Sequence, residues 1–255
     1  MSTNEVRVQR IDSTLLITID RPHARNAVNA SVAGLLSKAL DELEADATLR
    51  VGVLTGSQGT FSAGMDLKAA LEGELPTVPG RGFGGLTEAE LTKPLIAAVE
   101  GFALGGGFEL ALSCDLIVAA EDAEFGLPEV RRGLVAAAGG VLRLPKRIPY
   151  HLAMELLLTG RPVSGDRAGR LGLVNKVTAP GETVAAALEL AEQLTQSAPL
   201  SLAAVKRLVR TGDGMPEADA FAAQRAAMDT LMASADAHEG MTAFAERRAP
   251  RWTGK

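Results

Sequence analysis

The stretch that decides how this chain is interpreted is ALGGGFELALSCDLIVAAEDAEFGLPE, residues Ala103–Glu129. Its three consecutive glycines, Gly105–Gly107, leave room for a ligand atom to approach bare backbone, because glycine has no Cβ. The helix expected after them directs its free N–H groups and the positive end of its dipole toward such an atom. Glu109 falls in the first turn of that helix, and Glu129 falls in a second turn. One oxyanion site and two carboxylates could therefore meet, which suits proton transfer beside a carbonyl group.

A second glycine turn, FSAGMDL at residues 61–67, follows the predicted strand VGVLTG. Gly64 is expected to permit a sharp turn that presents the Met65 N–H, with Asp66 opening a short helix. Together with the Gly106 N–H, this predicts an oxyanion hole with two donors. Either turn alone is more typical of a tight strand–helix connection. The two turns together, with both acids, favour catalysis.

Other kinds of catalytic site lack their residues in this sequence. The three histidines, His23, His151 and His238, share no spacing with other possible ligands, so we expect no metal site. The sequence contains no G-x-S-x-G motif, so a serine hydrolase is not expected. Gly105–Gly107 lack the Lys-Ser/Thr that follows the glycines of a phosphate-binding loop. The single cysteine, Cys114, excludes an internal disulfide and is expected to serve packing. Carboxylates and backbone amides are therefore the groups left as candidates for catalysis.

Composition limits the possible partners. Of the 255 residues, 47% are hydrophobic and only 4% aromatic, so the core must be mainly aliphatic. A net charge of −5 argues against nucleic acid, and an anionic ligand would need a local basic patch. Met1–Arg10 has no apolar signal region, and no stretch approaches the roughly 20 apolar residues of a membrane span. We therefore expect a cytoplasmic protein with no membrane partner.

Short apolar runs alternate with helical patterns, which predicts an α/β fold with a largely parallel sheet. The runs are Leu15–Ile19, Val51–Thr55, Leu95–Val99, Leu116–Ala119 and Leu173–Val177. The clearest helix, over residues 32–44, places Val32, Leu36, Leu40 and Leu43 on one face. After about residue 180, four Ala-rich helices follow without a strand signal: 182–196, 200–210, 217–232 and 237–247.

Residues 69–87 are rich in glycine and proline, with few apolar residues. A long loop directly after a candidate binding turn is more typical of a mobile lid than of a linker. Gly80, Gly82 and Gly85 fit G-x-G-x-x-G, but no predicted strand precedes them, so a dinucleotide site is not expected.

The motifs FSAGMDL, ALGGGFELALSCDL, FGLPEV and LAMELLLTG resemble those of the enoyl-CoA hydratase/isomerase family, the crotonase superfamily. RPHARNAV, AGRLGLVNKV and FAERRAPRW match as well, so the resemblance covers nearly the whole chain. It implies a spiral of repeated ββα turns over residues 1–195. It also implies a C-terminal helical region, residues 196–255, that supports homotrimers or dimers of trimers.

The resemblance implies an acyl-CoA thioester as ligand, with no metal and no separate cofactor. The thioester oxygen would lie between the Met65 and Gly106 amides, and Glu109 and Glu129 would be catalytic. Water would add across the 2,3-double bond, with Glu129 delivering a proton to Cα and Glu109 activating the water. The implied substrate-binding residues are Ala24, Ala63, Met65, Asp66, Leu67, Lys68, Gly105, Gly106, Pro128 and Ala137. From the residues alone, Asp66 and Asp115 are more typical of capping or contact groups.

Several readings stay open within this resemblance. Ala136 and Ala137 stand where many hydratases have Pro-Gly, and the following GGVLRLPKRIP is similar to carnitinyl-CoA dehydratases. An enoyl-CoA isomerase commonly needs one acid, and a catalytically silent acyl-CoA binder commonly loses one, so two acids favour water chemistry. The candidate basic residues for the CoA phosphates are Arg25, Lys68, Arg247, Arg248, Arg251 and Lys255. The C-terminal members of this set are equally typical of a solvated tail.

Overall fold

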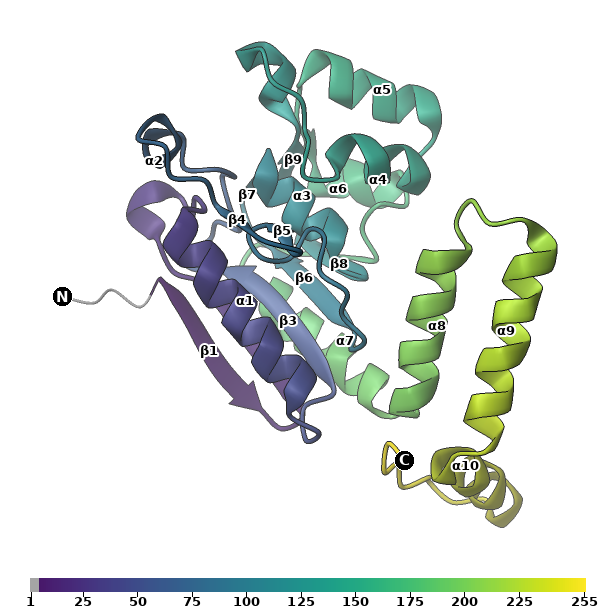
Figure 1. Ribbon diagram of the computed structural model, residues 1–255. Coiled ribbons are helices and arrows are strands. Elements are labelled where there is room, and N and C mark those ends of the chain that lie inside the picture. Colours follow the sequence, from purple (N-terminus) through teal and green to yellow (C-terminus); the bar gives the residue numbers. More distant parts are fainter. Residues whose placement is uncertain (1–4) are drawn as a thin grey trace.

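A six-stranded sheet lies at the centre of the computed structural model, which describes residues 5–255 (Figure 1). Residues 1–4, part of the segment we expect to lack a signal region, lie outside the described residues. The strand order is β1 (Val6–Ile11), β2 (Thr14–Ile19), β3 (Val51–Gly56), β6 (Leu95–Val99), β8 (Leu116–Ala120) and β11 (Lys176–Thr178). Only β1 is antiparallel to its neighbour, so the predicted α/β fold with a largely parallel sheet is confirmed.

Both faces of the sheet are buried, because successive side chains of a strand point to opposite sides. Val53 packs on one face with α7 (Thr183–Thr195), whereas its neighbour Leu54 belongs to the larger core on the other face. That larger core includes the predicted apolar face of α1 (Ala30–Ala45). The Asn29 side chain caps α1 by accepting a hydrogen bond from the Val32 N–H at 2.9 Å.

A small second sheet turns the chain into a spiral. Its strands are β10 (Val163–Ser164), β9 (Glu124–Gly126) and β7 (Phe102–Leu104), in that order. After β6 the chain forms β7 and then α3 (Gly106–Ser113); after β8 it forms β9 and then the 3₁₀ helix η2 (Pro128–Arg132). Ser62, which follows β3, bridges Ala103, and Ala103 pairs with Phe125. Three successive ββα turns therefore stack in register, as the resemblance implies.

The segment after β3 differs from the expected open loop. It contains α2 (Leu67–Leu71) and a hairpin of β4 (Thr77–Val78) and β5 (Gly82–Phe83). Phe83 and Leu86 are buried, so the second half of the segment is anchored in the core, whereas residues 71–75 are exposed. The anchoring exceeds what the glycine-rich composition indicates, and the mobile lid stays a prediction for the exposed part.

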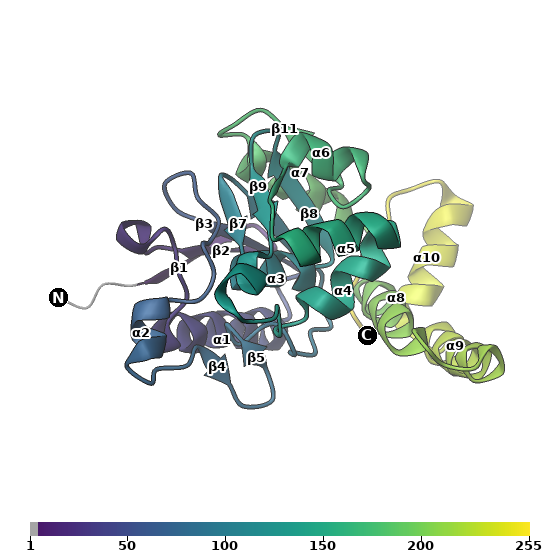
Figure 2. The ribbon, with the colours of Figure 1, turned by 90° about the horizontal axis from the view of Figure 1, so that it is seen from above.

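The remaining elements cover the spiral and extend from it. They are η1 (Pro22–Ala24), α4 (Gly140–Arg147), α5 (Tyr150–Thr159), α6 (Gly165–Arg170), α8 (Pro199–Gly212), α9 (Glu217–Met232) and α10 (Ala235–Glu246). Figures 1 and 2 show α8, α9 and α10 standing away from the sheet. The four Ala-rich helices are confirmed, whereas the division at residue 195 stays a prediction. The run Leu173–Val177 is strand only from Lys176 onward. Across residues 5–255, none of the helices is both long and apolar enough to cross a bilayer.

Candidate active site

The two glycine turns predicted from the sequence lie against each other. Gly64 has φ +92°, and a Cβ placed there would lie 2.6 Å from the Leu104 carbonyl oxygen and 2.9 Å from the Gly106 nitrogen. A Cβ on Gly107 would lie 2.2 Å from the Ser62 carbonyl oxygen. These positions must be glycine, because contacts this short are with rigid backbone. The in-register stacking of the spiral turns thus brings the two turns together.

Two backbone N–H groups are left free where the turns meet. Gly106 is the first residue of α3, so its N–H has no partner within the helix, and Gly105 before it has φ +55°. Met65 forms an isolated bridge with Val28, in which the Asp66 N–H donates to the Val28 carbonyl at 2.9 Å. Over residues 5–255, neither the Met65 nor the Gly106 N–H has an acceptor. The pair can therefore bind an oxyanion.

The Met65 turn is fixed by a buried arginine that sequence reasoning did not single out. Arg21 Nη1 donates to Asp66 Oδ2 at 3.0 Å and to the Ala27 carbonyl at 2.7 Å. The other Asp66 oxygen caps α2 through the Lys68 N–H at 3.1 Å, which confirms the capping role predicted for Asp66. Burial opposes ionisation, but these hydrogen bonds and the Arg21 charge lower the pKa of Asp66 overall. Asp66 is thus an ionised structural anchor.

Glu109 is almost wholly buried, with 3% of its surface exposed. It lies in the first turn of α3, as predicted, and its Oε1 accepts a hydrogen bond from the Gly140 N–H at 2.9 Å. The pKa of Glu109 is raised to about 7, mainly by burial and also by the Glu129 charge, while the N–H groups of Gly140 and Ala138 and the Arg143 charge oppose the shift. A carboxyl group that titrates near neutral pH can act as either acid or base.

Glu129 lies at the start of η2, beside the glycine turn of α3. A Cβ added to Gly105 would lie 3.1 Å from Glu129 Oε1, so this carboxylate lies directly beside the glycine turn. Its Oε2 is buried and has no hydrogen-bond partner among residues 5–255. Burial raises the pKa of Glu129. The carboxylate is placed against the oxyanion turn without a structural partner for one of its oxygens.

We expect the Glu109→Gln variant to be more stable than the parent protein at pH 8 but not at pH 4. The carboxyl pKa rises on folding from an ordinary 4.5 to about 7. Below 4.5 the group is protonated in both states; the cost of ionisation grows as pH rises toward 7 and is constant above it. A gain of about 2–3 kcal/mol follows for glutamine, which still accepts from Gly140. Denaturant unfolding at both pH values measures it, and equal gains at both would contradict the assignment.

Ala24, Ala63, Leu67 and Lys68, four of the predicted substrate-binding residues, border the Met65 turn. The Ala63 N–H donates to the Arg25 carbonyl at 3.0 Å, which places the end of η1 beside the turn. Leu67 and Lys68 are exposed at the start of α2, and Ala24 is half-buried. The exposed Arg25 guanidinium lies 5.6 Å from the centroid of the Phe102 ring.

Pro128 and Ala137, the other predicted binding residues, approach from the side of the glutamates. Pro128 begins η2 directly before Glu129. Ala137 is exposed, whereas Ala136 is buried, and a Cβ on Gly140 would lie 2.8 Å from the Ala136 methyl group. The alanines that replace Pro-Gly therefore lead directly into the backbone that binds Glu109.

Phe83 is a site residue that none of the sequence motifs indicated. A Cβ on Gly106 would lie 2.5 Å from the Phe83 ring, so the ring covers one side of the oxyanion turn. The signal was hidden because Phe83 stands among glycines in a segment interpreted as a loop.

Within one chain, the C-terminal basic residues lie away from the two glycine turns. Arg248 forms ion pairs with Glu239 and Glu246, both at 2.6 Å. Figures 1 and 2 both show the C-terminal end of the chain far from α2. Of the predicted basic patch, Arg25 and Lys68 alone lie at the Met65 turn.

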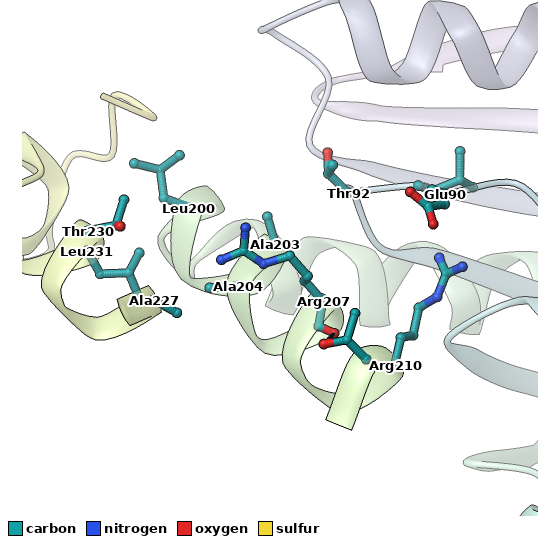
Figure 3. Close-up of a pocket in the computed structure, with 12 residues that line it drawn as sticks. Glu90, Thr92, Leu200, Ala203, Ala204, Arg207, Arg210, Ala227, Thr230 and Leu231 are labelled. Atoms are coloured by element: carbon teal, nitrogen blue, oxygen red, sulfur yellow. Dashed lines mark hydrogen bonds between the residues drawn. The ribbon is translucent and has the colours of Figure 1, made fainter. Parts of the chain in front are cut away.

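A cavity of about 430 Å³ lies elsewhere, between α8, α9 and the Glu90–Thr92 segment (Figure 3). Leu200 and Leu231 contribute apolar surface to it, and Arg207 and Arg210 contribute charge. None of the predicted site residues lines this cavity.

Cys114 is buried as expected, and burial raises the pKa of its thiol, which disfavours the reactive thiolate. Within residues 5–255, no group of three or more His, Cys, Asp or Glu side chains is placed to hold a metal ion.

Comparisons with known proteins agree with the motifs. A family model described as enoyl-CoA hydratase/isomerase matches residues 9–255. A Salmonella typhi protein named carnitinyl-CoA dehydratase is 46% identical, over 99% of this chain and 100% of the relative. An enoyl-CoA hydratase structure from Mycobacterium tuberculosis is 55% identical, with a TM-score of 0.97 over 99% of this chain and 100% of that one. A carnitinyl-CoA hydratase structure from Mycobacterium avium is 45% identical, with a TM-score of 0.80 over the whole of both chains.

Proposed function

Since the chain belongs to the enoyl-CoA hydratase/isomerase family, we propose that it reversibly adds water to a trans-2-enoyl-CoA. The product would be a 3-hydroxyacyl-CoA. The observation that carries this proposal is the meeting of two carboxyl groups of raised pKa, the buried Glu109 and the half-buried Glu129, at a turn with two free N–H groups. An enzyme that shifts only a double bond commonly needs one such acid, and a silent binder commonly loses one, so both acids favour water chemistry.

The thioester oxygen accepts hydrogen bonds from the Met65 and Gly106 N–H groups. They stabilise the negative charge that develops on this oxygen when water attacks C3. Glu109, as a carboxylate, takes a proton from the attacking water, and Glu129, as an acid, gives a proton to C2. The hydroxyl forms a bond to C3 as the C2–C3 π bond is lost. Glu129 has then given one proton to the product, and Glu109 has gained one from the water. Proton exchange with solvent returns Glu109 to the carboxylate and Glu129 to the protonated acid.

The CoA part is expected to approach over α2 and η1. Lys68 and Arg25 border the Met65 turn and supply positive charge for the CoA phosphates on a chain whose net charge is −5. A homotrimer or dimer of trimers and a cytoplasmic location are part of the same proposal. The exposed apolar side chains on α8, α9 and α10, including Val209, Phe221 and Phe244, support the helical region as a contact surface.

A specialised dehydratase is the second candidate, and it uses the same chemistry in reverse. The specific observation in its favour is the 46% identity with a protein named carnitinyl-CoA dehydratase. Ala136 and Ala137 beside the Glu109 loop support a pocket that differs from that of many hydratases.

Turnover of two thioesters distinguishes the candidates. With crotonyl-CoA, we expect the enone absorbance to fall as water adds; with carnitinyl-CoA, the specialised dehydratase would produce enone absorbance. The kcat/KM ratio of the two substrates identifies the preferred acyl group. If neither thioester nor longer enoyl-CoAs react while acyl-CoA still binds, the silent-binder alternative replaces the proposal.

A further inference from the structure

Arg143 on α4 is a half-buried arginine whose guanidinium bridges two segments of the candidate site. Its Nη1 donates to the Ala138 carbonyl at 3.2 Å, and its Nη2 donates to the Thr87 carbonyl. Ala138 belongs to the loop before α4, whereas Thr87 lies just after the β5 segment that carries Phe83. One side chain therefore ties together two parts of the chain that are distant in sequence.

The first of these segments supplies the hydrogen bonds to Glu109. The Gly140 N–H donates to Glu109 Oε1 at 2.9 Å, and the Ala138 N–H also lowers the pKa of this carboxyl group. The guanidinium lies tightly against Gly139, which has φ +107°: a Cβ there would lie 2.0 Å from Arg143 Nη1. Gly139 thus leaves the space that the arginine fills.

The second segment covers the oxyanion turn. Thr87 is buried, and the Phe83 ring a few residues before it packs against Gly106. Arg143 therefore connects the backbone that binds Glu109 to the segment that covers the Gly106 donor. Neither contact is with substrate, so any catalytic effect of Arg143 must pass through these neighbours.

We propose that Arg143 is a positioning residue: it ties the Ala138–Gly140 loop, whose Gly140 N–H binds Glu109, to the Thr87 segment that carries Phe83. This inference rests on the proposed hydration, in which Glu109 acts as the base. Without the guanidinium, the Ala138–Gly140 loop loses its anchor to Thr87, and Glu109 loses a positive charge that lowers its pKa.

The charges around the pair determine the direction of the effect. Glu109 faces Glu129 from η2, which raises its pKa, and Arg143 from α4, which lowers it. The charges that act on Arg143 are those of Arg210 on α8, Arg147 on its own helix, and Glu88, the residue after Thr87. Removing the Arg143 charge therefore raises the pKa of Glu109, so the rise of hydration rate with pH moves to higher pH.

The test compares Arg143→Gln and Arg143→Lys with Arg147→Gln, an exposed position one turn later on α4. Side-chain ¹³C labelling of glutamate follows the titration of Glu109 by NMR in the ligand-free protein, with Glu109→Gln identifying its signal. The kcat and KM for the preferred enoyl-CoA are measured against pH, and thermal unfolding checks the fold of each variant.

For Arg143→Gln we expect the Glu109 titration and the rising limb of kcat to move to higher pH together. We also expect kcat to fall roughly 10–100-fold because the base is misplaced, with little change in KM. Arg143→Lys should restore the titration but not the full kcat, since it cannot reach both carbonyls in the same way. Arg147→Gln should match the parent protein.

An unchanged Glu109 titration in Arg143→Gln overturns the inference, whatever happens to kcat, because losing the guanidinium charge and loosening the Gly140 N–H donor would both raise that pKa. A fully active Arg143→Lys overturns the loop-holding part. A parent protein that turns over no thioester defeats the proposed function instead, and the titration still decides the inference about Arg143.

Discussion

Replacing Glu129 with glutamine is expected to lower kcat for hydration by about 10²–10⁴-fold, with KM nearly unchanged. Glutamine has the size of the carboxylate but cannot deliver a proton to C2. Its effect on folding should be small, because Glu129 Oε2 has no hydrogen-bond partner among the described residues. The enone assay measures kcat and KM, and thermal unfolding verifies that the variant is folded.

The exposed Glu121 provides a matched control, since Glu121→Gln removes the same charge away from the glycine turns. This control should keep the parent kcat. A Glu129→Gln variant that retained more than about a tenth of the parent kcat would contradict the acid role, because the loss would fall below the range of general acid catalysis.

Proton exchange separates the roles of the two glutamates. A saturated acyl-CoA in D₂O cannot be hydrated, but a base beside the oxyanion hole can remove its C2 proton and return a deuteron. Glu129→Gln should lose this exchange, whereas Glu109→Gln should retain it while losing hydration. If Glu109→Gln also abolished exchange, the division of labour between the two carboxyl groups would be wrong.

The sequence was sufficient to predict both glycine turns, because their signals are local. Gly64 and Gly105 adopt positive φ values in short motifs where little else fits, and Asp66 begins a helix as capping residues do. Glu109 follows directly from its position after the Gly105–Gly107 turn, whereas Glu129, after Pro128, was matched through the family motif FGLPEV. Their catalytic roles remain predictions, but their placement beside the glycine turns is the one the motifs indicate.

The small sheet could not be predicted in the same way. Strands β7 and β9 have three residues each, too short for the alternation of buried and exposed side chains to be recognised. Yet the pairing of Ala103 with Phe125, and of Ser62 with Ala103, is what stacks the turns that carry the two glutamates and the two N–H donors. Long-range pairing, which no local pattern encodes, therefore assembles the site.

The supporting side chains were missed for a related reason. Arg21 contacts Asp66 across 45 positions of sequence, and Arg143 contacts Thr87 across 56. Each residue is an ordinary cation in its local context. Only the fold shows that Arg21 fixes the Met65 turn from one side, while Arg143 supports the Glu109 loop from another.

Replacing Gly64 with alanine is expected to lower kcat by at least about 10²–10³-fold, the cost of losing one oxyanion donor. The new Cβ would lie 2.6 Å from the Leu104 carbonyl oxygen and 2.9 Å from the Gly106 nitrogen. Both are backbone atoms that cannot rotate away, so the two turns must separate. The distance between the Met65 and Gly106 donors then increases, and the thioester oxygen can no longer be bound by both.

Gly181→Ala is the control that isolates this effect from backbone strain. Gly181 has φ +87°, close to the +92° of Gly64, but a Cβ there would meet nothing within 4 Å. Both variants therefore carry the strain of a left-handed alanine, whereas only Gly64→Ala pushes the oxyanion turns apart. Gly181→Ala should lose some thermal stability and keep its kcat. Calorimetry should also show that Gly64→Ala binds acyl-CoA no more tightly than free CoA, because its carbonyl site is lost. Equal losses of kcat in the two variants would mean that strain, and not donor geometry, limits the rate.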